Sequence, residues 1–252
     1  MLEKIRDEVR DRLVRMYRSA NAGHVGCSLS CLEMLVFIRF RLHSAGDDMI
    51  LSKGHAAALL YSVLAQAGEI SREEISSFYR DATMLPAHPP VGKVRSIPFA
   101  TGSLGHGLSV AAGLGLAARL RKSSKQIFCL TSDGELNEGS IWEAAMFISH
   151  HNLTNVIWMI DRNFIQGFGR TEDVIRMEPL DQKLEAFGFT VAKADGHDFE
   201  SMEAAVNGWD KQKPLAVICN TVKGRELLLQ DTVDCHYLPL TEEDFNKLII
   251  PA

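Results

Sequence analysis

The sequence lacks three features that would each point to a particular class of protein. None of its five cysteines lies in a CxxC pair, and Cys129 and Cys219 stand inside apolar runs, where a thiol behaves as a small hydrophobic side chain. Nowhere do about 18 apolar residues follow one another, as a membrane-spanning helix requires. The charged N-terminus does not fit a signal peptide. We therefore expect a reduced, cytoplasmic protein with no membrane span.

An excess of positive charge is also missing. The chain has 27 Lys and Arg against 32 Asp and Glu, for a net charge of -5, and the basic residues are scattered along it. This argues against a nucleic-acid partner, which needs a continuous basic face. With 252 residues and 46% hydrophobic composition, the chain is long enough to bury a substantial core. We expect residues 1–252 to form a single domain.

A regular alternation of strands and helices follows residue 126. The short apolar runs IFCLT, NVIWMID, FTVAKAD and PLAVICNT are separated by segments of helical pattern, and no internal repeat interrupts them. Such an alternation is typical of right-handed βαβ units. The predicted fold class is α/β, with a doubly wound, mostly parallel sheet and helices on both faces.

The first half of the chain predicts helices and one long loop. Ser30-x-x-Glu33 and Ser71-x-x-Glu74 each fit a capping box at the start of a helix. The proline-rich residues 81–105 predict a long irregular connection. Loops of this length are usually functional or disordered.

Polar residues follow two consecutive predicted strands. Asp133 directly follows the run IFCLTS, and Asn163 comes just after NVIWMID. Ligands of open parallel sheets bind at the carboxyl ends of strands, so both side-chain oxygens should lie at one edge. One carboxylate and one amide hold Mg²⁺ best when phosphate oxygens complete its coordination. Gly134 lets the backbone approach a diphosphate, and the following helix presents its N-terminus.

A simpler interpretation of the same residues is structural. Asp133-Gly134 is also a common turn dipeptide, and Glu135 and Glu138 could merely complement a helix dipole. Spacing alone does not decide between a turn and a diphosphate site.

Several ordered sequence blocks carry a resemblance to a known family. The chain resembles the N-terminal, pyrophosphate-binding portion of transketolase, in the form in which the enzyme is split into two subunits. The blocks are GHVGCSLS (23–30), LSKGHAAALLYSVLAQAG (51–68), TGSLGHGLSVAAGLGLAARL (101–120), SDGELNEGSIWEAAMF (132–147), DRNFIQ (161–166) and TVKGRE (221–226).

The resemblance implies a site for thiamin diphosphate and a divalent metal. Asp133, Asn163 and the backbone carbonyl of Ile165 match the metal ligands, with Mg²⁺, or Ca²⁺ or Mn²⁺ in its place. The implied cofactor-binding residues are His55, Gly102, Ser103, Leu104, Asp133, Gly134, Glu135, Asn163, Ile165 and Lys223.

The resemblance also implies the chemistry and the residues that serve it. In the family, the thiazolium carbanion of the cofactor attacks a ketose, and a two-carbon unit passes to an aldose. The matching catalytic residues are His24, His55, His88, His236 and Glu138, the last linking two cofactor sites across a dimer. Histidines suit this role because their ordinary pKa of about 6.5 allows proton transfer near neutral pH.

Two departures qualify the resemblance. Ser132 replaces the first glycine of the family's GDG motif, where a Cβ could crowd the diphosphate or a hydroxyl could bind it. The chain is also too short to include the family's pyrimidine-binding region. We therefore expect a partner subunit carrying that region, assembled with this chain in a heterotetramer, and a sugar or sugar phosphate as substrate.

Two other functions stay open at this point. One is a different thiamin diphosphate enzyme, such as a ligase of specialised metabolism or a 2-oxo acid dehydrogenase component. The other is a non-catalytic homologue, against which the presence of Asp133, Asn163 and several histidines argues. The sequence does not name the natural sugars, the pathway or the partner.

Overall fold

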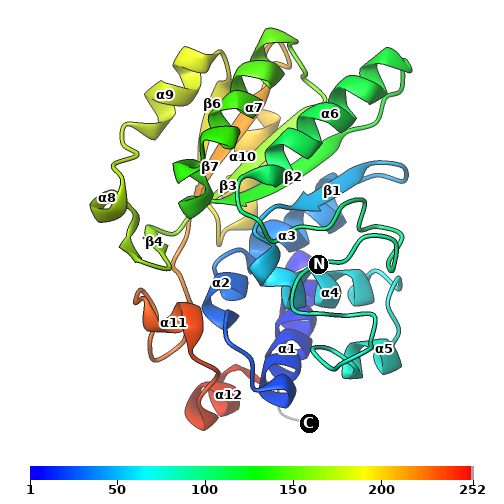
Figure 1. Ribbon diagram of the computed structural model, residues 1–252, viewed down its shortest axis with the longest axis vertical. Helices are drawn as coiled ribbons and strands as arrows, with labels where there is room; N and C mark the ends of the chain where they lie inside the picture. Colours follow the sequence, from blue (N-terminus) through cyan, green and yellow to red (C-terminus); the bar gives the residue numbers. More distant parts are fainter. Residues whose placement is uncertain (251–252) are drawn as a thin grey trace.

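The computed structural model describes residues 1–250 and is built on a parallel sheet (Figure 1). Its five strands lie in the order β1-β2-β3-β7-β6, and every neighbouring pair is parallel. The strands are β1 (Asp48–Leu51), β2 (Ile127–Ser132), β3 (Val156–Arg162), β6 (Thr190–Asp195) and β7 (Leu215–Asn220), and a separate antiparallel hairpin pairs β4 (Ile165–Gln166) with β5 (Gly169–Arg170). The predicted doubly wound parallel sheet is confirmed.

Helices cover both faces of the sheet, and each face has its own apolar cluster (Figure 1). One face carries α6 (His106–Leu120), α7 (Gly139–His150) and α9 (Leu180–Phe187). The other carries α1 (Leu2–Ala20), α3 (Leu32–Phe37), α4 (Ala57–Gln66) and α10 (Phe199–Asn207). The shorter helices are α2 (Val25–Leu29), α5 (Arg72–Ser76), α8 (Thr171–Val174), α11 (Asp234–Tyr237) and α12 (Glu242–Leu248), with a π-helical turn over Ile38–Leu42 and 3-10 turns over Gly54–Ala56 and Gly134–Asn137.

Strand β2 shows why the central strands are almost entirely apolar. Phe128 and Leu130 pack with the cluster beneath α1 and α3, whereas Ile127 and Cys129 pack with the cluster beneath α6 and α7. Side chains alternate between the two faces of a strand, so burial on both faces requires a continuous apolar run. The polar ends of these strands are therefore the first positions free to carry chemistry.

The path of the chain explains which helix lies on which face. The chain reaches β3 from β2 through α7 and reaches β6 from β3 through α9, and both helices lie on the same face. It then steps back from the edge strand β6 to β7, and α10 lies on the opposite face. A reversal of direction moves the helix to the other face because parallel crossovers are right-handed.

One of the two predicted capping boxes is correct. The Ser71 hydroxyl accepts from the Glu74 amide, and the Glu74 carboxylate accepts from the Ser71 amide, at the start of α5. The box predicted at Ser30 is wrong, because α3 begins at Leu32 without a side-chain cap. The Ser30 hydroxyl instead donates to the Asp161 carboxylate at 2.6 Å. Residues 81–105 form the predicted irregular connection.

Among residues 1–250, no helix combines the length and the apolar character that a bilayer crossing requires.

Candidate functional site

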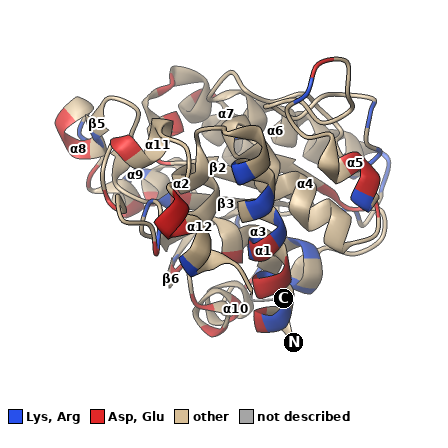
Figure 2. Ribbon diagram, turned by 90° about the horizontal axis from the view of Figure 1, so that it is seen from below, with Lys and Arg blue, Asp and Glu red and all other residues tan. Residues whose placement is uncertain are grey.

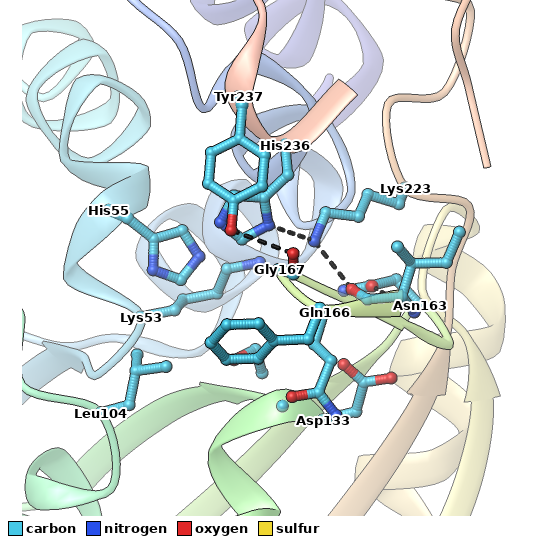
Figure 3. Close-up of a pocket in the computed structure, with 14 residues that line it drawn as sticks. Lys53, His55, Leu104, Asp133, Asn163, Gln166, Gly167, Lys223, His236 and Tyr237 are labelled. Atoms are coloured by element: carbon cyan, nitrogen blue, oxygen red, sulfur yellow. Dashed lines mark hydrogen bonds between the residues drawn. The ribbon is translucent and has the colours of Figure 1, made fainter. Parts of the chain in front are cut away.

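The carboxyl ends of β2 and β3 bring the two predicted metal ligands to the same edge of the sheet. Ser132 pairs with Asp161 in the parallel register, so Asp133 and Asn163 follow on neighbouring strands. The Asp133 amide donates to the Asp161 carbonyl at 3.0 Å, which extends the ladder by one residue. Both side chains are buried and line one pocket (Figure 3). The structure thus brings together the acid and the amide that sequence spacing pairs.

The two oxygens of the Asp133 carboxylate have different surroundings. Oδ2 accepts hydrogen bonds from Arg162 Nη1 at 3.0 Å, the Phe164 amide at 2.7 Å and the Thr171 hydroxyl at 3.1 Å. Oδ1 is buried and has no hydrogen-bond partner among the described residues. A buried carboxylate oxygen normally has a hydrogen-bond partner. A bound ion at the site would explain why this one has none. Burial raises the pKa of Asp133, and the nearby Asp161 raises it further.

A tight turn after β3 places the third predicted ligand. Phe164 adopts the left-handed conformation with φ of 64°, and the Ile165 amide donates to Asn163 Oδ1 at 3.2 Å. The Ile165 carbonyl accepts from Lys223 Nζ at 2.7 Å. A carbonyl oxygen has two lone pairs, so this bond leaves one free. Asn163, Ile165 and Lys223 all line the same pocket as Asp133.

This main pocket lies between the sheet edge and a group of histidines (Figure 3). Its volume is about 190 Å³, and its other walls include His55, Leu104, Gly134 and His236. Gly134 lies close to the facing hairpin, because a Cβ at this position would come within 3.1 Å of the Cβ of Gln166, which is tighter than an ordinary contact. Ser132, the departure from the family motif, also lines the pocket.

Three of the four predicted catalytic histidines form one cluster. The ring centroids of His24, His55 and His236 lie 5.1 to 5.6 Å apart. Backbone contacts hold the cluster, because the His24 amide donates to the His236 carbonyl at 3.0 Å and the Tyr17 hydroxyl donates to the His24 carbonyl at 3.2 Å. The structure thus brings His236, from the C-terminal part of the chain, together with His24 and His55.

The fourth histidine lies in an adjoining pocket. This second pocket has a volume of about 100 Å³ and is lined by His24, His55 and His88, so His55 contributes to both pockets. A Cβ on Gly102 would come within 3.0 Å of the His88 ring. The glycine at position 102 therefore allows His88 to occupy its place in the long loop.

The surroundings of the histidines favour their neutral forms. Burial lowers the pKa of His24, His55 and His88, and the effect is largest for His55, where Lys53 and His236 add to it. Burial and the neighbouring Lys223 lower the pKa of His236 to about 3. Lys223 Nζ lies 2.8 Å from His236 Nδ1. Because a lysine ammonium can only donate, Nδ1 accepts and the ring proton resides on Nε2.

A buried ion pair at the wall of the main pocket, which Lys53 lines, has no counterpart in the sequence-based predictions. Lys53 and Asp161 are 1% and 0% exposed, and Lys53 Nζ donates to Asp161 Oδ2. The Asp161 carboxylate also accepts from the hydroxyls of Ser30 and Thr221. Although burial opposes both charges, the pairing raises the pKa of Lys53 and lowers that of Asp161. The pair joins β3, β7 and the 52–56 segment below the histidines.

Arg162 is a further residue that sequence reasoning missed. Its guanidinium is 1% exposed and lies 4.3 Å from the centroid of the Phe164 ring. Besides Asp133, it donates to Glu172 at 2.5 Å and to Glu178 at 3.0 Å. Arg162 therefore ties the segment that follows β5 to the carboxylate at the sheet edge.

Four predicted site residues line neither the main pocket nor the adjoining one. The carboxylate of Glu135 is buried and accepts from the Ser52 hydroxyl, the Gly105 amide at 3.0 Å and the Ser132 amide at 2.9 Å. Burial raises its pKa. Glu135 thus holds three segments together, a role that the sequence signal of a helix-start acid does not reveal. The other three residues outside both pockets are Gly102, Ser103 and Glu138.

The donor set restricts the kind of metal that this edge could hold. Within residues 1–250, no three or more His, Cys, Asp or Glu side chains are grouped as a metal site. The available donors are oxygens, namely Asp133 Oδ1, Asn163 Oδ1 and the Ile165 carbonyl. Such a set suits a hard cation that keeps part of its coordination for water or phosphate.

Curated proteins of similar length are parts of split enzymes. An apulose-4-phosphate transketolase subunit of Actinobacillus succinogenes is 38% identical over 234 residues, covering 88% of this chain and 85% of its own length. The 6-deoxy-6-sulfo-D-fructose transketolase subunit SqwG of a Clostridium species is 38% identical over 239 residues, covering 90% and 87%.

Larger relatives contain this chain as one part. Human transketolase is 32% identical, and the match covers 98% of this chain but 41% of that protein. The crystal structure of transketolase from Campylobacter jejuni superposes with a TM-score of 0.91 at 30% identity, covering 98% of this chain and 42% of that one. Residues 3–250 match the family model described as the thiamine diphosphate binding domain of transketolase. The chain therefore belongs to the transketolase family of transferases.

Proposed function

We propose that this chain is the thiamin diphosphate-binding subunit of a split transketolase, which moves a two-carbon ketol unit from a ketose or ketose phosphate to an aldose. The observation that carries the proposal is the buried Oδ1 of Asp133, which has no hydrogen-bond partner within residues 1–250 and belongs to a residue that shares a pocket with His55 and His236. The lengths and names of the relatives support the split form.

The proposed metal is Mg²⁺, with Ca²⁺ or Mn²⁺ as substitutes. Asp133 Oδ1, Asn163 Oδ1 and the Ile165 carbonyl would hold it, leaving positions for diphosphate oxygens. Gly134, where an added Cβ would be 3.1 Å from the Cβ of Gln166, would let the backbone approach the diphosphate. When bound, thiamin diphosphate supplies the electron sink that breaking a bond next to a ketose carbonyl requires.

The chain's own residues would position the sugar and move its protons. His55 and His236 face the main pocket, and His24 and His88 extend the row into the adjoining one. Their lowered pKa values keep them neutral near pH 7, so His24, His55 and His88 can each accept a proton on one nitrogen and donate from the other. His236 offers Nε2–H as a donor to a sugar oxygen, because Lys223 occupies Nδ1. Lys223 would also hold the Ile165 carbonyl in place.

Glu135 and Glu138, which do not line the main pocket, would support the site from outside it. Glu135 would fix the junction after β2 against the loop that carries Gly102, Ser103 and Leu104. Glu138 is exposed beside Gly105, where a Cβ would contact its side chain at 2.6 Å. We assign Glu138 to a contact with a second copy of the chain.

A partner subunit would complete the enzyme. The chain covers about two fifths of full-length relatives, so a pyrimidine-binding partner would supply the rest in a heterotetramer. We further propose that residues 1–252 form one domain, which is supported by the single sheet shared by both apolar clusters. The five buried, unpaired cysteines support a reducing, cytoplasmic location.

The test uses this chain coexpressed with its partner subunit. With thiamin diphosphate and Mg²⁺, the complex should convert fructose 6-phosphate with an aldose acceptor, whereas the isolated chain should be inactive. Turnover of a 2-oxo acid in place of the ketose would identify a different thiamin diphosphate enzyme. If the complex shows no metal-dependent binding of thiamin diphosphate by calorimetry, the chain is a non-catalytic homologue.

A matched pair of variants tests the metal ligand. Asp133→Asn removes the charge of the proposed ligand and should weaken binding of thiamin diphosphate with Mg²⁺ at least tenfold. Asp173→Asn, at an exposed position of the nearby helix α8, makes the same change away from the pocket and should bind like the wild type. Equal affinities of the two variants would remove Asp133 from the metal site.

A further inference from the structure

A basic groove lies outside the site described above. It runs along α1 and α5, which both carry basic residues in the view of Figure 2, and has a volume of about 300 Å³. Its charged lining consists of Arg12, Arg15, Arg72 and Arg80, and no carboxylate lines it. Four guanidinium groups around one concavity form a local positive field that the overall charge of -5 does not predict.

One of the four arginines is held rigidly in place. Arg12 is partly buried, and its guanidinium donates to the Ser62 carbonyl and to the Gln66 side chain, both at 2.9 Å. Burial lowers its pKa, the carboxylates of Glu8 and Asp11 oppose this shift, and the positive charge of Arg72 adds to it. Arg12 and Arg72 are thus near enough to repel each other. An anion between them would relieve this repulsion.

The other charges nearby leave the groove positive. Arg15 pairs with Asp11 at 2.9 Å, and Glu8, which accepts from Gln66, lies near Arg12. Arg72 and Arg80 form no ion pair among the described residues. Glu74 on α5 is engaged in the capping box with Ser71. Two exposed arginines are therefore available to a ligand.

The floor of the groove is apolar. Met16 and Phe78 line it and are 4% and 6% exposed. Phe78 packs edge-on against Tyr17 and Tyr61, with ring centroids 6.2 and 6.0 Å apart, so this floor is fixed. Binding pockets for small molecules combine such an apolar surface with a few charged groups, and 300 Å³ falls at the lower end of their sizes.

We propose that this groove binds a phosphorylated small molecule that has an apolar ring or chain. Guanidinium groups match the geometry of phosphate oxygens and can bind them in pairs, which favours an arginine cluster over scattered lysines for this purpose. The phosphate would lie between Arg12, Arg72 and Arg80, and the apolar part would pack on Met16 and Phe78. Phe78 also lines the pocket of His24 and His88, so the groove adjoins the back of the histidine cluster.

The test measures binding of phenyl phosphate to the chain by calorimetry, in EDTA and without thiamin diphosphate. The wild type should bind one equivalent saturably and more tightly than inorganic phosphate, and phenol should give no signal. The variant Arg72→Ala with Arg80→Ala should bind at least tenfold more weakly. A control with the same change in charge is Arg121→Ala with Lys122→Ala, at exposed positions after α6, which should bind like the wild type.

A further variant separates the groove from the cofactor site. Asp133→Asn should bind phenyl phosphate like the wild type, because Asp133 lines a different pocket. The proposal is wrong if Asp133→Asn alters the affinity for phenyl phosphate or if binding to the wild type does not saturate. It is also wrong if the variant lacking Arg72 and Arg80 binds as tightly as the control variant lacking Arg121 and Lys122. None of these outcomes depends on transketolase activity.

Discussion

Arg162 and Asp133 form a buried ion pair in which only one carboxylate oxygen takes part. Nη1 of Arg162 donates to Oδ2 at 3.0 Å, while Oδ1 has no partner within the described part of the chain. The backbone at Phe164 and the Thr171 hydroxyl bind the same Oδ2. Three donors on one oxygen fix the rotation of the carboxylate and leave the other oxygen without a partner among the described residues.

Loss of Arg162 should destabilise the protein strongly. Arg162→Met leaves Asp133 without its counter-ion in a site where both groups are 1% exposed, and breaking such a pair costs about 3–5 kcal/mol. The control is Arg170→Met, which breaks a pair with Asp231 whose side chains are 58% and 50% exposed, at a cost of at most about 1 kcal/mol. Urea unfolding measures both values, and similar losses would contradict the proposed importance of the buried pair.

The pair of Lys53 and Asp161 should behave as a coupled unit. Lys53→Met and Asp161→Leu each leave one buried charge without its partner, at a cost of about 3–5 kcal/mol. The double variant removes both charges and should lose less than the sum of the single variants by at least about 1 kcal/mol. A double-mutant cycle on the free energy of unfolding tests this, and additive losses would show that the two groups do not interact.

The sequence was informative about the sheet edge because the signals there are local. Asp133 and Asn163 each follow an apolar strand, and consecutive parallel strands end at the same edge, so their proximity could be predicted without coordinates. The ion pair of Lys53 with Asp161 joins positions far apart in sequence. No periodicity marks such a pairing, so it became visible only in the structure.

Glu135 shows how a correct local pattern can give an incomplete role. An acid after Asp133-Gly134 is equally compatible with a helix dipole and with a cofactor site, and the sequence offered both interpretations. In the structure a 3-10 turn over Gly134–Asn137 precedes α7, which begins only at Gly139. This turn directs the carboxylate inward to Ser52 and Gly105. The position of Ser52 and Gly105 depends on tertiary packing that the local pattern does not contain.

His55 should make stability depend on pH. Burial holds its folded-state pKa well below the unfolded value of about 6.5, so the unfolded chain binds the extra proton. Stability is then lost as pH falls below about 6.5, and His55→Gln should reduce the slope between pH 6 and 5 by up to about 1.4 kcal/mol per pH unit. Urea unfolding at several pH values measures this slope. His150→Gln, on the exposed end of α7, is the control, and equal slopes for both variants would contradict the prediction.

Gly54 should tolerate no side chain, although its φ is not in the left-handed region. A Cβ at Gly54 would lie 2.6 Å from the Thr101 carbonyl group and 2.7 Å from the Gly102 amide, and these backbone atoms cannot rotate away. Gly54→Ala should therefore displace the segment leading to Leu104 in the pocket wall and cost about 1–3 kcal/mol. We also expect weaker binding of thiamin diphosphate.

The matched substitution is Gly113→Ala in α6, where an added Cβ meets nothing within 4 Å. Because glycine is unfavourable inside a helix, this change should stabilise the protein by about 0.5–1 kcal/mol. Thermal unfolding of the two variants should therefore shift in opposite directions, and calorimetry should show reduced cofactor affinity for Gly54→Ala alone. Shifts of the same sign would mean that the contact between residues 54 and 101–102 does not shape the pocket wall.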